Sequence, residues 1–268
     1  MTESLSDWLA LREPADRAAR SDTLARRVAE MLPSHRPVRI VDLAAGTGAN
    51  LRYLVTRLPR PQHWVLADRD PVLLAEARRS PARADHIEIR EMDLGPVESL
   101  DICSGCHLVT ASALLDLVSE TWLQTLALRC GAEGAAVLFA LTYDGRSDCL
   151  PQEPEDDVIR RLFNHHQTRS DKGFGRAAGP AAASCAARAL TAAGYHVEVA
   201  ASDWRLGPAM AGLQRRLVRG WADAAAEIDA SASPTIAGWM SRRLAHIDDG
   251  RSSITVGHQD LVAWPMSE

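Results

Sequence analysis

The stretch Arg39-Ile-Val-Asp-Leu-Ala-Ala-Gly-Thr-Gly-Ala-Asn-Leu-Arg-Tyr-Leu54 decides the fold of this 268-residue chain. A short apolar run ends at Asp42, a loop of small residues follows, and a helical pattern begins. This order predicts a strand, a tight turn and the start of a helix. Gly46 and Gly48 allow backbone conformations that a side chain disfavours, and they let a ligand approach closely. The N–H groups that open the helix then point at whatever the loop binds.

Two nucleotide-type ligands suit such a loop, and the first is a dinucleotide. The dinucleotide fingerprint is Gly-x-Gly-x-x-Gly after a strand, with an acid about 20 residues later. In a frame that starts at position 44, Ala44 and Ala49 replace two of the three glycines. In a frame that starts at Gly46, the third glycine is replaced by Leu51. The fingerprint therefore loses at least one glycine in either frame.

The second ligand is S-adenosylmethionine (SAM). Residues 42–48 resemble motif I of the class I SAM-dependent methyltransferases, an acid-x-Gly-x-Gly-x-Gly loop. The one departure is Ala44, which stands where the motif has its first glycine. The resemblance implies a Rossmann-like fold, SAM as cofactor and S-adenosylhomocysteine as product.

A second acid follows a second apolar run. His63-Trp-Val-Leu-Ala-Asp68 is typical of a buried strand, and Asp68 lies 20 residues after Gly48. A carboxylate at this place accepts hydrogen bonds from both hydroxyls of a ribose. Asp70 and Pro71 then have the pattern of an N-cap and a first helical residue. This acid fits both ligands and does not separate them.

A third acid separates them. Residues 86–94 alternate as a strand that ends in Asp93. In the methyltransferase family, an acid here accepts a hydrogen bond from the adenine amino group and its neighbour packs on the ring; Asp93 and Leu94 match. The acids of three successive strands lie on one edge of a parallel sheet, where open α/β sheets bind ligands. The resemblance covers residues 37–142 well and the C-terminal part loosely. It implies these cofactor-binding residues: Asp42, Ala44, Ala45, Gly46, Gly48, Asn50, Asp68, Arg69, Asp93, Leu94, Thr110 and Ala111.

Strand and helix patterns alternate beyond this region, which predicts an α/β fold with a doubly wound, mostly parallel sheet. We expect seven strands, the last antiparallel, with a helical N-terminal cap and a helical insertion between strands six and seven. Residues 144–180 are polar and rich in Gly and Pro, so we expect a long irregular loop with a short helix at 155–166. The expected parts are a cap (1–36), a SAM-binding core (37–207), an insertion or lid (208–250) and the final strand (251–268).

Composition narrows the class of partner. The net charge is −5 and the pI is near 6.0, which argues against a nucleic acid. No apolar run reaches the ~18 residues of a membrane span, and the N-terminus lacks the pattern of a signal peptide, so we expect a cytoplasmic protein. Arginine replaces lysine almost everywhere except at Lys172, as a GC-rich bacterial genome would produce. Cys103 and Cys106 have metal-like spacing but no second pair, so we expect free thiols and no metal.

Catalytic candidates must project from the ends of the later strands. Methyl transfer is an in-line displacement in which the protein mainly orients the reactants. Asp116 follows the fourth strand and suits an acceptor-orienting or basic role, or is an ordinary surface acid. Tyr143 and Asp144 follow the fifth and line an acceptor site or form a turn. His165 has a pKa suited to a base, although adjacent histidines on a polar helix are commonly surface residues.

The expected activity is SAM-dependent methyl transfer to a small molecule, a metabolite or natural-product intermediate. Thr110-Ala-Ser-Ala stands where methyltransferases of nucleic-acid bases carry an Asn/Asp-Pro-Pro-Tyr-like motif, which favours a small acceptor. Two alternatives stay open: a SAM-using cyclisation or aminopropyl transfer that releases methylthioadenosine, and a non-catalytic SAM-binding protein. Trp204, Trp221 and Trp239 either wall the acceptor pocket or belong to the core, and a stripe containing Trp221 also suits a homodimer. Arg12 and Glu13 either cap the cofactor pocket or end a solvated helix.

Overall fold

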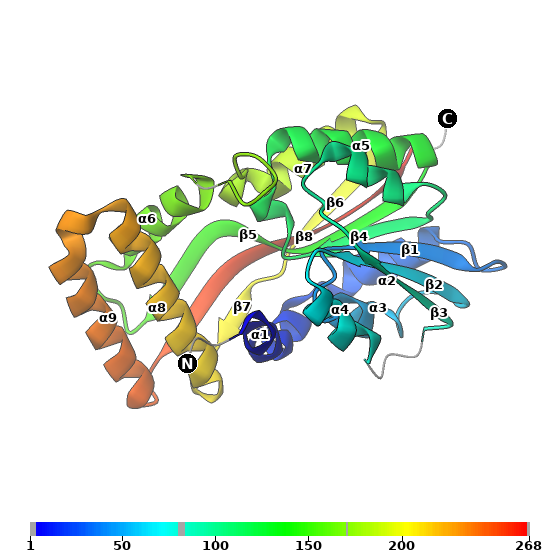
Figure 1. Ribbon diagram of the computed structural model, residues 1–268. Coiled ribbons are helices and arrows are strands. Elements are labelled where there is room, and N and C mark those ends of the chain that lie inside the picture. The colour runs from blue at the N-terminus through cyan, green and yellow to red at the C-terminus, as the bar shows by residue number, and fades with distance from the viewer. Residues whose placement is uncertain (1–3, 80–83, 170, 267–268) are drawn as a thin grey trace.

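The computed structural model describes residues 4–79, 84–169 and 171–266 (Figure 1). The sheet has the order β3-β2-β1-β4-β5-β8-β6, with the short strand β7 paired to β8. Strands β1 to β5 are parallel, whereas β8 is antiparallel to both β5 and β6. The predicted α/β fold with an antiparallel last strand is therefore confirmed, and β7 is an additional eighth strand. The strands are β1 (Val38–Leu43), β2 (Gln62–Asp68), β3 (His86–Glu91), β4 (Leu108–Ser112), β5 (Ala136–Leu150), β6 (Tyr195–Ala201), β7 (Trp204–Leu206) and β8 (Ser253–Pro265).

Helices cover both faces of the parallel part, as a parallel sheet requires. Figure 1 shows α5 (Glu120–Glu133) and α7 (Ala182–Ala192) on one face and α2 (Asp22–Met31), α3 (Ala49–Leu54) and α4 (Pro71–Arg78) on the other. Successive residues of β1 point to opposite faces of the sheet. Val41 packs in the core beneath α5 and α7, and Ile40 packs in the core beneath α2, α3 and α4. This sandwich fixes the ends of β1 to β4, where the polar side chains gather.

Strand β5 is longer than the sequence predicts. Residues 144–150, expected to be an irregular loop, continue the strand and pair with β8. The Asp144-Gly145 dipeptide favours a turn, but here it forms an irregularity inside the strand: Gly145 has a φ of 87° and the register shifts between Tyr143 and Ser147. The long-loop prediction is wrong for this segment because the partner strand comes from the end of the chain.

A second helical layer packs at the far end of β5 and β8 (Figure 1). It consists of α6 (Asp156–Arg169), α8 (Ala211–Ile228) and α9 (Ser233–Asp248). The buried guanidinium of Arg243 donates to Asp156 through Nε at 3.0 Å, and Trp239 Nε1 donates to the same carboxylate at 2.8 Å. The predicted insertion between the last two long strands is therefore helical, and Trp221 and Trp239 belong to its core.

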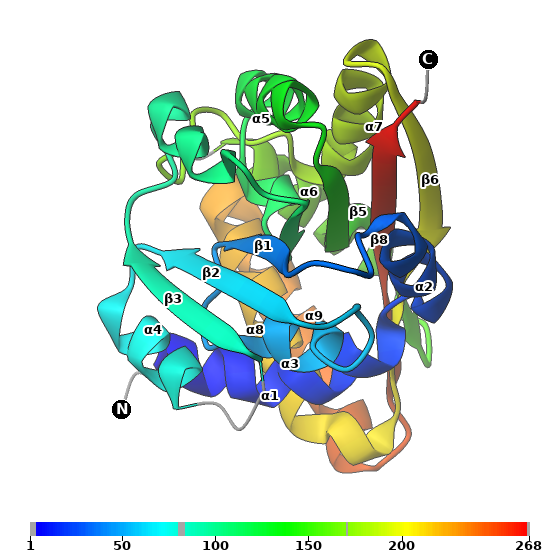
Figure 2. The same cartoon turned by 90° about the vertical axis from the view of Figure 1, so that its right-hand side faces the viewer.

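The N-terminal cap consists of α1 (Leu5–Ala19) and α2. Figure 2 shows α1 in the lower half of the view, beside α4 and α3. Ser6 Oγ donates to Glu76 on α4 at 2.7 Å, and Trp204 Nε1 on β7 donates to Asp16 at 3.0 Å. Helix α1 thus joins α4 to β7. No helix in the described ranges is both long and apolar enough to cross a membrane.

Candidate functional site

A cavity of about 270 Å³ lies at the carboxyl ends of the central parallel strands. It is bordered by the segments that follow β1, β2, β3 and β4, by α1 and by the loop 171–176. Gly48, Thr110 and Ala111 do not line it, and neither does any residue of 208–250. The other predicted cofactor residues do: Asp42, Ala44, Ala45, Gly46, Asn50, Asp68, Arg69, Asp93 and Leu94.

The loop after β1 has a left-handed backbone at alternate residues. Ala44, Gly46 and Gly48 have φ values of 52°, 53° and 80°. A side chain at such a position is strained, by about 1–3 kcal/mol, which accounts for glycine at the two later positions and makes Ala44 the strained one. A Cβ on Gly46 would lie 3.2 Å from Leu9 Cδ1 of α1, so the loop is also packed closely from outside.

Two of the strand-end acids are fixed by backbone amides. Gly46 N donates to Asp68 Oδ2 at 2.8 Å and Asp70 N donates to Asp68 Oδ1 at 3.0 Å. Gly95 N donates to Asp93 Oδ1 at 2.9 Å. An ionised carboxylate has about four acceptor sites, so both side chains keep capacity for a ligand. Their positions are set before any ligand arrives.

The third acid, Asp42, is fully buried and only partly satisfied. Asn50 Nδ2 donates to Asp42 Oδ1 at 2.7 Å, whereas Asp42 Oδ2 has no hydrogen-bond partner among the described residues. Burial raises the pKa of Asp42 to about 7, although the hydrogen bond from Asn50 and the charge of Arg20 lower it. A buried, unpaired carboxylate oxygen is costly, and a cationic group in the cavity would satisfy it. Thr110 positions Asn50 by accepting from its amide at 3.1 Å.

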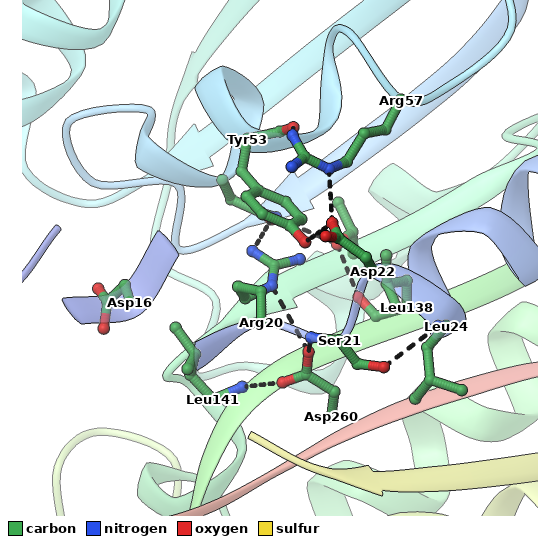
Figure 3. A network of polar contacts seen from close by, with 12 residues as sticks. Asp16, Arg20, Ser21, Asp22, Leu24, Tyr53, Arg57, Leu138, Leu141 and Asp260 are labelled. Atoms are coloured by element: carbon green, nitrogen blue, oxygen red, sulfur yellow. Dashed lines mark hydrogen bonds and ion pairs between the residues drawn. The ribbon is translucent and has the colours of Figure 1, made fainter. Parts of the chain in front are cut away.

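Arg20, a buried arginine that the sequence did not reveal, lies between Tyr53 and Asp260 (Figure 3). Arg20 Nη1 donates to Asn50 Oδ1 at 2.9 Å, and Arg20 Nε lies 3.7 Å from Asp260 Oδ2. The guanidinium also lies 4.3 Å from the centre of the Tyr53 ring. Asp260 accepts in addition from Leu141 N at 2.8 Å. The network therefore ties the cap, the start of α3 and β8 together.

Helix α1 forms one wall of the cavity. The residues Leu5, Leu9, Arg12 and Asp16 line it, and their spacing of four, three and four places them on one helical face. The neighbouring Glu13 accepts hydrogen bonds from Nε and Nη2 of Arg52, at 2.7 and 2.6 Å. The run Arg12-Glu13 therefore joins the wall of the cavity to α3.

The loop 171–176 forms another wall of the cavity, beside Asp93. Lys172 and Phe174 line the cavity, and the Phe174 ring meets Trp122 edge-on at 5.7 Å. Trp122 Nε1 donates to Leu94 O at 2.8 Å. A Cβ added to Gly95 would overlap the carbonyl oxygen of Gly173, so the two backbones touch. Only glycine at position 95 lets the loop lie this close.

The first catalytic candidate, Asp116, lies next to the cavity without lining it. It belongs to the turn η2 (Leu115–Leu117), and its neighbours Leu114 and Leu117 are part of the wall. The Asp116 side chain is buried, and burial raises its pKa against the opposing charges of Lys172 and Arg12.

The other three candidates lie farther along β5 and α6, and none lines the cavity. Tyr143 is buried and its hydroxyl donates to Asn164 Oδ1 at 2.8 Å; burial raises its pKa. Asp144 accepts from Arg146 at 2.6 Å, and His165 is exposed on α6. The catalytic roles of these residues stay predictions.

The cysteines do not contribute to the cavity. All five thiols are free and buried. Within the described ranges, no group of three or more His, Cys, Asp or Glu side chains is placed to hold a metal ion.

Comparison with known proteins adds a fold and a local sequence match. No family model matches the chain. A curated relative, 3-methylorcinaldehyde synthase tropA of Talaromyces stipitatus, is 34% identical over 95 residues, which are 34% of this chain and 4% of that protein. The matched segment is thus a small part of a much longer relative.

Among solved structures, a predicted methyltransferase from Bacillus halodurans superposes with a TM-score of 0.51 at 14% identity, covering 91% of this chain and 96% of that one. A SAM-dependent methyltransferase from Geobacter sulfurreducens, in complex with S-adenosylhomocysteine, gives a TM-score of 0.48 at 13% identity over 99% and 100% of the two chains. The first of these likenesses shows a shared fold.

Proposed function

We propose that this chain, which has the fold of the class I SAM-dependent methyltransferases, binds SAM in the cavity described above and transfers its methyl group to a small molecule. One observation carries the proposal. Asp42, Asp68 and Asp93 lie at the carboxyl ends of three neighbouring parallel strands and line the same cavity. Ligands of open α/β sheets bind at this edge.

Each of the three acids suits a different part of SAM. Asp68 is held by Gly46 N and keeps acceptor capacity for the ribose hydroxyls. Asp93 suits the adenine amino group, and the buried Leu94 suits the face of the ring. The unpartnered Oδ2 of Asp42 suits a positive charge. The hydrogen-bond acceptors of the cavity therefore fit the cofactor that motif I suggests.

The chemistry needs little from the protein beyond placement. SAM supplies a methyl group bound to a sulfonium sulfur. This sulfur leaves as the neutral thioether of S-adenosylhomocysteine, so the leaving group needs no acid. The residues of this chain bind and orient the reactants and keep water away. Asp116, buried beside Leu114 and Leu117 of the wall, is the residue we propose to orient or deprotonate the acceptor.

The enclosure of the site favours a small acceptor. Helix α1 and the loop 171–176 both contribute to the wall, so a substrate must enter a partly covered cavity. The volume of about 270 Å³ lies just below the range for small-molecule sites, roughly 300–1,000 Å³. The net charge of −5 also favours a small molecule over a nucleic acid.

The nucleoside product tests the reaction type. The protein is incubated with methyl-labelled SAM and a small-molecule extract of its source organism, and the products are separated by mass. We expect S-adenosylhomocysteine and label in an extracted compound. Methylthioadenosine would instead indicate the alternative, a cyclisation or aminopropyl transfer. If SAM binds but no nucleoside product forms with any extract, the non-catalytic alternative holds. The matched control is Asp68→Ala, which should form no product.

A further inference from the structure

We infer that helix α1 provides the subsite for the amino-acid end of SAM, with Arg12 binding the carboxylate and Asp16 the ammonium group. The inference rests on the proposed function, because it assigns one part of the same ligand. Arg12 and Asp16 lie one helical turn apart on the face of α1 that lines the cavity.

The position of this pair along the sheet edge agrees with the shape of the ligand. Asp93 follows β3 and Ser112 ends β4, so β2 and β1 lie between them. With strands about 4.8 Å apart, three spacings separate the two ends by roughly 14 Å. The acids suited to adenine and ribose occupy the β3 and β2 end. Asp16 borders Ser112 and Asn50 in a small adjoining cavity and therefore lies at the other end.

Helix α1 reaches that end because it is fixed along the glycine loop. Leu9 Cδ1 lies 3.2 Å from the place a Cβ of Gly46 would take, and Glu13 is bonded to Arg52, which donates to Thr47 O at 2.6 Å. Residues 9–16 therefore follow the loop closely. An amino-acid chain that extends from a ribose at Asp68 past this loop would meet Arg12 and Asp16.

The two side chains are held in place before a ligand binds. Arg12 Nε donates to Asp16 Oδ2 at 2.8 Å and Arg12 Nη2 donates to Asp16 Oδ1 at 3.2 Å. Trp204 Nε1 donates to Asp16 Oδ1 at 3.0 Å, and the guanidinium lies 5.1 Å from the centre of the Trp204 ring. Only 12% of the Arg12 side chain and 15% of the Asp16 side chain are exposed. Such preorganisation lowers the entropy lost on binding.

Both groups keep capacity for a zwitterion. A guanidinium has five N–H donors, and two of them serve Asp16. Asp16 Oδ2 accepts one bond among the described residues and has a second lone pair. Asp42 Oδ2 adds an unpartnered acceptor at the same end. Each charged group of SAM thus has a protein group of opposite charge. The guanidinium of Arg12 suits the carboxylate of SAM, and the carboxylates of Asp16 and Asp42 suit its ammonium and sulfonium groups.

The other two cations of the wall differ from Arg12 in their positions. Arg69 directly follows Asp68 and therefore lies toward the β2 end. Lys172 belongs to the loop whose neighbour Gly173 touches Gly95, although its charge also acts on Asp116, as that of Arg12 does. Among the described cations that line the cavity, Arg12 is the one that lies on α1 and pairs with Asp16.

A cycle of two proteins and two ligands tests the assignment. Calorimetric titration measures the affinities of wild type and Arg12→Met for SAM and for decarboxylated SAM, which lacks only the carboxylate. We expect wild type to bind SAM tighter than decarboxylated SAM, on the order of 10- to 100-fold, the range of a charged hydrogen bond. Arg12→Met should lose this preference by weakening SAM binding alone. The control Arg26→Met alters an exposed arginine of the neighbouring helix α2, which lines neither cavity, and should keep the preference for SAM.

A second variant covers the case in which Arg12→Met does not fold. Asp16→Asn keeps an acceptor for Trp204 and should weaken SAM binding while its affinity for 5′-methylthioadenosine, which lacks the whole amino-acid end, stays that of wild type. The inference is overturned if wild type binds SAM and decarboxylated SAM equally, or if either variant binds SAM as wild type does. Absence of SAM binding by wild type would instead reject the proposed function.

Discussion

Arg20 donates a hydrogen bond from Nη1 to Oδ1 of Asn50 at 2.9 Å, and this contact joins the N-terminal cap to the first turn of α3. Asn50 passes the connection on, because its Nδ2 donates to Asp42 at 2.7 Å. On the other side, Arg20 lies beside Asp260 of β8. The cap is thus an internal part of the site, and its removal would leave buried polar groups without partners.

Replacement of Arg20 by methionine should therefore destabilise the protein strongly. The variant leaves Asp260 buried beside no cation and removes a partner from Asn50. Loss of one partner of a buried ion pair costs about 3–5 kcal/mol. Urea unfolding measures the free energy of unfolding of the variant and of wild type.

Arg57→Met is the matched control. Arg57 also packs on the Tyr53 ring, at 3.9 Å, but its ion-pair partner Asp22 has a side chain that is 68% exposed. Exposed pairs contribute at most about 1 kcal/mol, so the control should unfold close to wild type. Equal losses in the two variants would contradict the role given to the buried network.

Asp68→Ala should abolish measurable SAM binding while the protein stays folded. The substitution removes the proposed acceptor for the ribose and a partner of Gly46 N, at the surface of the cavity and not in the core. Asp70→Ala is the control, because Asp70 caps α4 through Val72 N and Leu73 N. It should cost about 1 kcal/mol of stability and leave the affinity unchanged. Retained SAM affinity in Asp68→Ala would contradict the assignment.

SAM affinity should rise with pH and level off above about pH 7. Burial raises the pKa of Asp42 to about 7, so the free folded protein keeps this proton well above the ordinary carboxyl range. A cation in the cavity requires the ionised form, and binding below pH 7 therefore releases a proton. The affinity should fall by up to about tenfold per pH unit below that point. Titration at pH 5.5, 6.5 and 8 in buffers of different ionisation enthalpy measures both effects.

The same shift has a defined sign for stability. The pKa of Asp42 in the folded protein exceeds its ordinary value, so protonation of Asp42 stabilises the fold. This contribution to the free energy of unfolding is fully present below about pH 4 and is lost as the pH rises through 7. His258 does not interfere, since burial lowers its pKa to about 4 and it stays neutral in the binding range. Asp42→Asn should remove the proton release, and an unchanged release in that variant would contradict the assignment to Asp42.

Gly95→Ala should displace the loop 171–176. The added Cβ would overlap the carbonyl oxygen of Gly173. Lys172 is the only lysine of the chain, so a lysine-specific protease can cut it at one place, inside this loop. We expect faster cleavage of Gly95→Ala than of wild type, and slower cleavage of wild type when SAM is present.

The control for the loop is Gly207→Ala. No atom lies within 4 Å of the Cβ that this variant would add, and Gly207 has an ordinary φ of −85°. Its cleavage rate at Lys172 should match wild type. If Gly95→Ala were also cleaved at the wild-type rate, the contact between the two backbones would not hold the loop.

Local signals account for the part of the site that sequence predicted. Asp42, Asp68 and Asp93 each follow a short apolar run, so their place at one sheet edge follows from the alternation of strands and helices. Ala44 departs from motif I, and its φ of 52° explains why glycine is usual there. These features depend on residues close together in the chain.

The missed features depend on residues far apart. Ser21 N donates to Asp260 across 239 residues, and no local pattern distinguishes the buried Arg20 beside it from a solvated arginine of a helix end. From the sequence, Arg12 either caps the pocket or ends a solvated helix, but no local pattern shows that it pairs with Asp16 beneath Trp204. Strand β5 continues through Asp144-Gly145 because β8, more than 100 residues later, pairs with it.

The most direct measurement of the central claim is calorimetric titration of the wild-type protein with SAM, S-adenosylhomocysteine and NADH. The three strand-end acids and the incomplete dinucleotide fingerprint predict binding of SAM and S-adenosylhomocysteine at one site per chain and no binding of NADH. Binding of NADH, or no heat with SAM, would contradict the account, because the cavity between Asp42 and Asp93 would then serve another ligand.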